Sequence, residues 1–187
     1  MGFKGIPFIW YKIDEEHAKG LNLNLLGSAI EGRYDGVNIN GLFSINEGNF
    51  NGLNLGGIIG DIGGDLKGVN ISGVVGSVGF VSDSSAERNL KGANISGVVG
   101  FISGELYGVS YSTLVNYAMT NGRIAIQVGA VNLIRDYNSD GTAIQLGAYN
   151  KIGAQRIPGV NIRGWKNLGR SEKKDLEEVI EKQKKEI

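Results

Sequence analysis

The stretch most typical of metal chemistry is DYNSDG, at residues 136–141. Asp136, Asn138 and Asp140 occupy alternate positions before Gly141, which is how a calcium loop of the EF-hand type begins. Such a loop takes a bidentate glutamate at its twelfth position, where this chain has Gly147. Asp, Asn and Gly are also common turn residues. We therefore interpret the stretch as a bulged turn, with calcium binding by Asp136, Asn138 and Asp140 as the alternative, and we expect no other cofactor.

Residue types that carry out nucleophilic or metal-assisted catalysis are sparse. The chain has one histidine, His17, and no cysteine, so His17 lacks the partners of a catalytic triad or a zinc site. We expect it to be a solvated turn residue. The glycine-rich stretches do not spell a phosphate-binding loop. These observations predict that the protein is not an enzyme.

The most regular polar residues are amides, and they recur inside a repeated phrase. Residues 68–76 read GVNISGVVG and residues 92–100 read GANISGVVG. The period is 16 residues, with one insertion of eight and two small slips. The nine copies start at Leu21, Val37, Leu53, Val69, Ala93, Val109, Ile126, Ile144 and Val160. The second position, which we call the amide column, holds Asn22, Asn38, Asn54, Asn70, Asn94, Gln127, Gln145 and Asn161, with Ser110 in the sixth copy.

The residues around each amide predict short β-strands. Gly or Ala precedes every copy, and the third position is always Leu, Ile, Val or Tyr. Alternation of apolar and polar residues with closely spaced glycines is typical of strands joined by tight turns. The second half of the repeat carries two further apolar positions. They are Ile30, Ile45, Ile62, Val78 and Ile102, and Tyr34, Phe50, Leu66, Leu90 and Leu106.

Two all-β architectures can use a unit of this length: a β-solenoid with one rung per repeat, and an antiparallel β-barrel. Glycines only four residues apart, such as Gly32 and Gly36, leave too little chain for the strands of a barrel. A solenoid also explains why one residue type recurs at one phase, because equivalent positions stack. We predict a β-solenoid of about nine 16-residue rungs, with the antiparallel barrel as the alternative.

In a solenoid the amide column has two possible orientations. Pointing inward, the amides bond to one another in a ladder, as in other stacked-strand structures. Pointing outward, they form a polar face suited to carbohydrate. We favour the ladder. Val69 and Ile71 flank Asn70, and because they offer more apolar area for burial, we expect Ile71→Ala to be more damaging than Asn70→Leu.

The chain divides into an N-terminal cap at 1–19, a β-repeat array at 20–165 and a charged tail at 166–187. Phe8, Trp10 and Tyr11 make the first segment aromatic, as is suitable for covering a solenoid end. The tail predicts an amphipathic α-helix beginning at Ser171, which acts as a lid or, alternatively, as an oligomerising coil. Either end, or the helix, offers a route to self-association.

Charge and hydropathy exclude several partners. The formal net charge is zero and no basic patch is present, so we expect no nucleic-acid binding. No apolar run reaches the length of a transmembrane helix, and the N-terminus lacks the pattern of a signal peptide.

The phrases AIQVGAVNLI (125–134) and AIQLGAYNKI (143–152) resemble the Gly-x-Gln-Ile-Gly-Leu-x-Asn repeats of glycine-rich bacterial surface-repeat proteins, a family of unknown activity. The resemblance covers the array only and implies a non-enzymatic protein at the cell surface. We therefore predict a structural or adhesive scaffold. The alternatives are a carbohydrate-binding module that uses the amides and a membrane-associated β-barrel.

Overall fold

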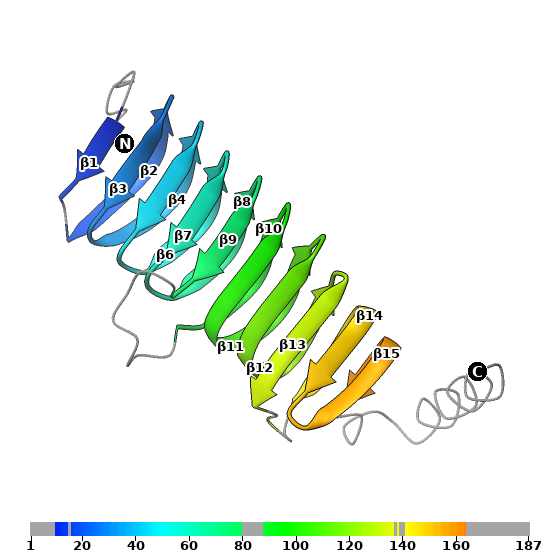
Figure 1. Cartoon of the computed structure of the whole chain (residues 1–187). Coiled ribbons are helices and arrows are strands. Elements are labelled where there is room, and N and C mark those ends of the chain that lie inside the picture. Colours follow the sequence, from blue (N-terminus) through cyan, green and yellow to red (C-terminus); the bar gives the residue numbers. More distant parts are fainter. Residues whose placement is uncertain (1–9, 15, 80–87, 137, 139–140, 164–187) are drawn as a thin grey trace.

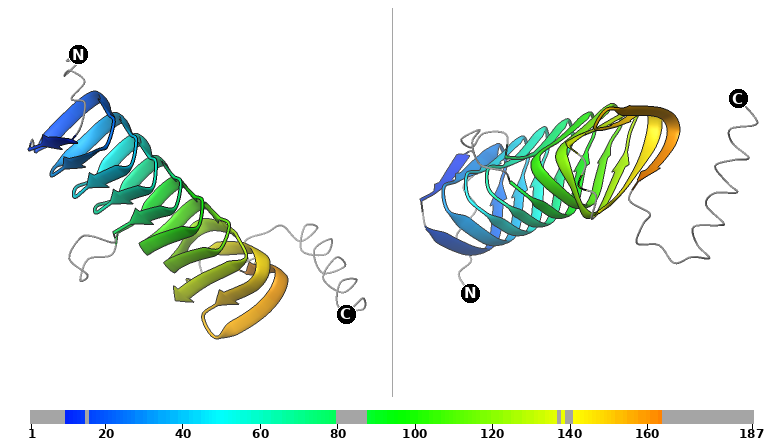
Figure 2. Two further views of the ribbon diagram at one scale, coloured as in Figure 1. Left: turned by 45° about the horizontal axis from the view of Figure 1, so that its top comes forward. Right: turned by 90° about the horizontal axis from the view of Figure 1, so that it is seen from below.

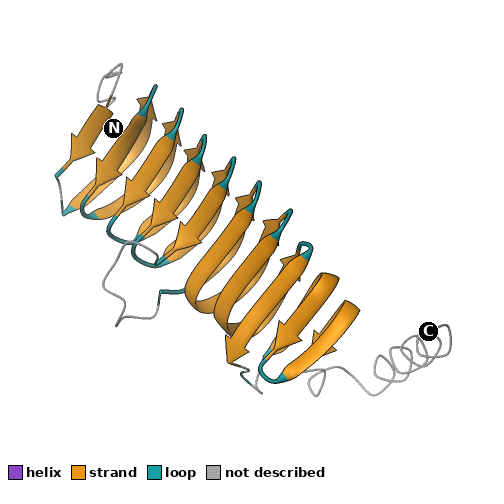
Figure 3. Cartoon of the chain, viewed as in Figure 1, coloured by secondary structure: helices purple, strands orange, loops and turns teal. Residues whose placement is uncertain are grey.

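The chain winds into a β-solenoid of about eight turns (Figure 1). The structure is a computed structural model, and it describes residues 10–14, 16–79, 88–136, 138 and 141–163. These residues contain strands and connecting turns but no helix (Figure 3). Turns stacked at about 4.8 Å make a rod roughly 40 Å long. The predicted helix of the 166–187 tail lies outside the described residues.

Each turn places one strand on each of two broad faces, seen obliquely in the right-hand view of Figure 2. The first face contains β2 (His17–Asn24), β4 (Arg33–Asn40), β6 (Phe50–Gly56), β8 (Leu66–Ser72) and β10 (Leu90–Ser96). The second contains β1 (Trp10–Ile13), β3 (Gly27–Ile30), β5 (Phe43–Asn46), β7 (Ile59–Ile62), β9 (Val75–Val78) and β13 (Val131–Asp136). Longer strands run from one face to the other: β11 (Val99–Ser112), β12 (Val115–Val128), β14 (Thr142–Ile152) and, at the end, β15 (Gln155–Arg163).

Neighbouring turns pair in parallel and in register. Gly52 pairs with Gly68 and Asn54 with Asn70, so equivalent positions of successive copies stack directly, as the period predicts. The antiparallel-barrel alternative is therefore wrong. The described strands begin at Trp10, inside the segment assigned to the cap, because β1 pairs with β3.

The ninth copy does not form a ninth rung. Gly153 adopts a positive φ of 57°, and the chain reverses there, so that Ile152 pairs with Gln155. Strand β15 then runs back antiparallel along β14. The prediction of about nine rungs is thus one too many, because a two-residue turn replaces the corner that would have continued the coil. This reversed strand covers the last turn, a role that the sequence analysis gave to the helix of the tail.

The apolar core lies on one side of the interior, where two columns face each other. One column holds Tyr34, Phe50, Leu66, Leu90 and Leu106, and the Tyr34 and Phe50 rings stack with centroids 5.4 Å apart. The other column begins with Ile30, Ile62, Val78 and Ile102. Ile45 is the exception, since Asn46 takes the inward position that pairs with Ile30 and Ile45 points outward.

The eight-residue insertion leaves the register of the turns intact. Strands β8 and β10 pair in seven consecutive positions although their partners are 24 residues apart, for example Leu66 with Leu90. Asn89, which follows the insertion, links the corners of successive turns. Its side-chain oxygen accepts a hydrogen bond from the backbone amide of Glu105 at 2.8 Å, and its backbone amide donates to the Asp65 side chain at 2.9 Å. We call these bonds the corner ladder. The corner therefore resumes by Asn89.

Two deletions of equal length are expected to differ in stability. Removal of 80–87 keeps Asn89 and should change the free energy of unfolding by less than about 1 kcal/mol, because loop length has a small effect. Removal of 82–89 deletes the Asn89 side chain and should cost about 1 kcal/mol more for its lost hydrogen bond. Urea denaturation of both variants measures the difference. Equal free energies of unfolding for the two variants would show that the Asn89 side chain does not stabilise the fold.

Candidate functional site

The amide column lies inside the solenoid, opposite the apolar core. Asn38, Asn54, Asn70 and Asn94 have no exposed side-chain surface, and neither do Gln127 and Gln145. Each comes from the same phase of a first-face strand, where alternation along the strand turns it inward. Their neighbours at the two flanking positions point outward. The structure thus brings all the predicted column residues into one buried row.

Neighbouring amides in the first half of the column hydrogen-bond directly. The Nδ2 atom of Asn22 donates to Oδ1 of Asn38 at 2.8 Å, and Asn38 donates to Asn54 at 2.9 Å. The chain continues from Asn54 to Asn70 at 2.8 Å and from Asn70 to Asn94 at 2.9 Å. A primary amide has both donor and acceptor groups, which is why one residue type can extend such a chain through any number of turns. The predicted ladder is confirmed over these five residues.

The facing strands accept the remaining hydrogen bonds of the amides. The second hydrogen of Asn70 goes to the backbone oxygen of Gly60 at 2.9 Å, and Asn94 donates to Gly76 at the same distance. A Cβ atom built on Gly60 would lie 2.6 Å from Oδ1 of Asn70. Small residues on β7 and β9 therefore make room for the large amides on β6, β8 and β10.

A second ladder on the opposite face was missed by the sequence analysis. In the sixth turn the sizes of the facing residues exchange. Ser110 takes the place of the amide, and its hydroxyl donates to Asn116 on the second face. Asn116 then bonds to Asn132 at 2.9 Å, and Asn132 to Asn150 at 2.8 Å. The signal was present, since each Asn follows the Ser or Gln of its turn by five or six residues. The column itself resumes with Gln145 donating to Gln127 at 2.8 Å.

Burial removes the outward-facing alternative for the amide column. A sugar hydroxyl cannot reach side chains without exposed surface, so the carbohydrate-binding face proposed for these amides does not exist in this fold. The expectation that Val69 and Ile71 form the core is wrong for the same reason. Both point outward and are only partly buried, whereas Asn70 lies inside.

The sequence DYNSDG lies where β13 leaves the second face. Asp136 is exposed and its carboxylate lies 3.8 Å from Nε of Arg135. The backbone amide of Asn138 donates to the Asn121 side chain at 2.9 Å, and Gly141 donates to the Asn138 carbonyl at 3.2 Å. These bonds fit a turn. Asp140 lies outside the described residues, so calcium binding by the three stays a prediction.

His17 begins β2, so its assignment to a turn is wrong. Its Nε2 lies 2.8 Å from Oδ2 of Asp35, one turn along, and Arg33 donates to the other oxygen at 3.0 Å. The hydrogen bonds from His17 and Arg33 lower the pKa of Asp35, which therefore stays ionised. Burial raises the pKa of Tyr34 to about 12, so its hydroxyl is a donor, to the Gly20 carbonyl at 3.0 Å.

Within the described ranges, no three His, Asp or Glu side chains gather closely enough to hold a metal ion. The part of the chain that the structure describes has no helix long and apolar enough to cross a membrane. Comparison with protein-family models, with curated proteins and with solved structures finds no match.

Proposed function

We propose that the protein is a non-enzymatic structural or adhesive scaffold associated with a cell surface. The observation that carries the proposal is the ladder itself. The most regular polar side chains of the chain are used to join one turn to the next, as in the bonds from Asn54 to Asn70 and from Asn70 to Asn94. Repetition of one unit along a rod provides an extended surface, which is what a scaffold requires. The resemblance to surface-repeat proteins supports the same role.

Removing single turns tests the proposal, because the repeat allows exact excisions. Deletion of 37–52, 53–68 or 93–108 takes out one 16-residue unit and leaves equivalent ladder residues to pair across the junction. Beads coated with each variant would be held under flow against bilayer-coated, polysaccharide-coated and hydrophobised glass. The wild type should resist detachment better than albumin on at least one surface.

A scaffold should lose adhesion by a similar, graded amount whichever turn is removed. One deletion that abolishes adhesion while the others have no effect would indicate a single localised site and contradict the proposal. Detachment of wild-type beads as easily as albumin beads from every surface would also contradict it. Circular dichroism of each variant, with the β-signal retained, shows that the comparison is between folded proteins.

A further inference from the structure

The outer surface of the solenoid is apolar along one edge, on both faces and around the turn that joins them. In the fourth turn this surface comprises Val69 and Ile71 on β8, Val74 in the connecting turn and Val75 on β9. Three exposed aliphatic side chains lie in the connecting turns, with 61% of Leu25, 54% of Leu114 and 39% of Val74 accessible. We call this surface the apolar edge. It consists of the outward-facing residues of 21–29, 37–45, 53–61, 69–77, 93–101, 109–117, 126–133 and 144–151.

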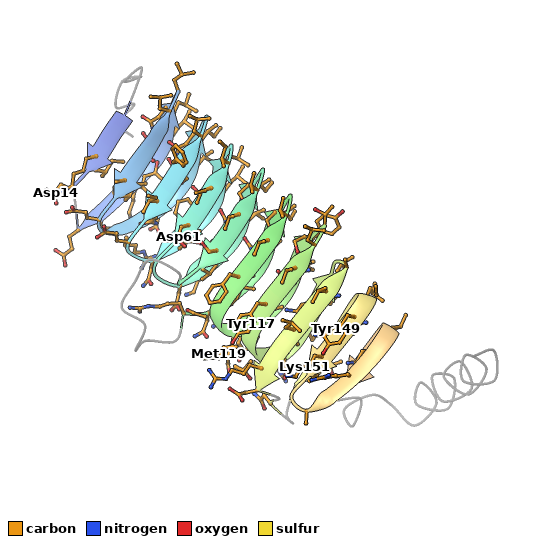
Figure 4. The ribbon with its side chains drawn as sticks, in the orientation of Figure 1. Asp14, Asp61, Tyr117, Met119, Tyr149 and Lys151 are labelled. Atoms are coloured by element: carbon orange, nitrogen blue, oxygen red, sulfur yellow. The ribbon has the colours of Figure 1, made fainter. Side chains whose placement is uncertain are left out.

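Charges are segregated from the apolar edge. Its eight stretches contain two charged residues, Asp61 and Lys151, both labelled in Figure 4. Asp61 is only 1% exposed and accepts a hydrogen bond from Ser77, and Lys151 lies in the last turn. The other charged residues that the structure describes between Leu21 and Ile152 fall in the intervening corner segments, at the opposite edge of the cross-section. Both signs occur there, as with Asp35 and Lys67.

The polar groups behind the apolar edge are turned inward. The amide column lies directly beneath the outward-facing aliphatic side chains of β4, β6 and β8, and its members bond to one another. The strand backbones pair with the turns above and below. A structure that enters hydrocarbon must satisfy its backbone and buried polar groups internally. The amide column does so from Asn22 to Asn94 through its ladder, whereas Nδ2 of Asn40 and Oγ of Ser72 have no hydrogen-bond partner.

The shape of the apolar edge indicates what covers it. A second copy packed against one face would leave the other face and the connecting turns in water, whereas hydrocarbon covers all three at once. The edge is about four strand residues deep, or roughly 13 Å, which is well short of the roughly 30 Å bilayer core. Because the charged corners run the full length of the rod, the rod cannot stand upright in the bilayer.

We propose that the apolar edge inserts into one leaflet of a lipid bilayer, with the rod axis parallel to the membrane and the charged edge in water. The occupant is the acyl-chain layer, and the mixed charges of the opposite edge give no preference for anionic headgroups. This inference rests on the proposed scaffold role and names the surface that the scaffold contacts. It is the geometry of interfacial elements, which bury an apolar face roughly 5–10 Å deep.

Vesicle flotation tests the insertion. The full chain should float with phosphatidylcholine vesicles, and equally with vesicles containing phosphatidylglycerol, at both low and high salt. The double variant Leu25→Lys/Leu114→Lys should bind about 100-fold more weakly, roughly tenfold for each exposed leucine. The matched control Lys67→Gln/Lys91→Gln, on the charged edge, should bind within about twofold of wild type. Circular dichroism verifies that both variants are folded.

Fluorophore labelling locates the inserted edge without removing an apolar patch. Because the chain has no cysteine, Val74→Cys and Lys67→Cys each provide one labelling site. An environment-sensitive nitrobenzoxadiazole label should brighten several-fold and shift to the blue on vesicles at position 74. The same label at position 67 should not change.

Three results of flotation and labelling would overturn the inference. These are wild-type protein that stays at the bottom of the gradient, equal label responses at positions 74 and 67, and binding that the lysine control abolishes, which would indicate headgroup attraction. Light scattering that shows wild-type oligomers, dissociated by the leucine variant and unable to float, would assign the edge to a second copy. Wild-type beads that adhere to polysaccharide but not to bilayers would overturn lipid insertion while leaving the scaffold proposal standing.

Discussion

Replacing Gly68 with alanine is expected to destabilise the solenoid by about 2–6 kcal/mol. Gly68 has a φ of 138°, and a Cβ atom built on it would lie 2.0 Å from the backbone oxygen of Gly52 in the preceding turn. The backbone conformation alone costs about 1–3 kcal/mol for a residue other than glycine. Relief of the overlap adds about 1–3 kcal/mol, since one turn must move away from the next. The sum is a large part of the stability of an ordinary domain.

Gly153→Ala is the matched control for Gly68→Ala. Gly153 also has a positive φ, 57°, but a Cβ atom added there would have no other atom within 4 Å. The substitution should therefore cost only the strain of the backbone conformation, about 1–2 kcal/mol. Urea denaturation monitored by circular dichroism gives both values. A loss at Gly68 no larger than that at Gly153 would show that the turns are not as closely stacked as the structure has them.

The glycines that precede the copies, such as Gly52 and Gly68, stack in a column and show how far the sequence predicts this fold. A small residue before every copy, repeated at a period of 16, requires that equivalent positions meet, and only a stacked coil achieves that. The solenoid, its strands and the stacking of the amides in one column follow from the period and the residue types. The physical reason for the glycine is not visible in the sequence, because the close approach to the preceding carbonyl depends on the distance between turns.

Three features required knowledge of partners across the interior. Ile45 and Asn46 are reversed relative to Ala29 and Ile30, and the alternation pattern does not reveal which of the two faces inward until the turns are paired. The second ladder begins where a small residue, Ser110, faces a large one, Asn116, and that relation is visible only when the two strands are seen to face each other. The reversal at Gly153 depends on a single turn. Each of these is decided by a contact between segments, whereas the period reports only what is repeated.

The aliphatic residues that flank each amide also show why the sequence alone did not predict which side chains are buried. Apolar residues on both sides of a polar one normally indicate that the apolar pair is buried. Here the pair, Val69 and Ile71, faces outward, and the hydrogen bonds of Asn70 compensate for its burial. An amide can occupy a dry interior only when equivalent amides lie at the correct distance above and below. The stacked repeat supplies that condition in every turn.

Asn70→Leu is therefore expected to be more damaging than Ile71→Ala, the reverse of the order that the sequence predicts. Leucine would leave Nδ2 of Asn54 without its acceptor and Oδ1 of Asn94 without its donor. At about 1–3 kcal/mol for each unsatisfied group, the loss is about 2–6 kcal/mol. Ile71→Ala removes a partly exposed side chain and should cost about 1 kcal/mol. Chemical denaturation of the two variants side by side decides the order, and a larger loss for Ile71→Ala would place Asn70 on the outside.

The double variant Asn54→Leu/Asn70→Leu distinguishes a ladder from a row of independently buried amides. Each single substitution leaves the other half of the Asn54–Asn70 bond unsatisfied, whereas the double variant removes both halves together. Its loss of stability should therefore be smaller than the sum of the single losses, by at least about 1–3 kcal/mol. Strict additivity would mean that the two amides do not depend on each other. A positive coupling would show that what stabilises each turn is the identical residue in the next, which is why the chain repeats its phrase.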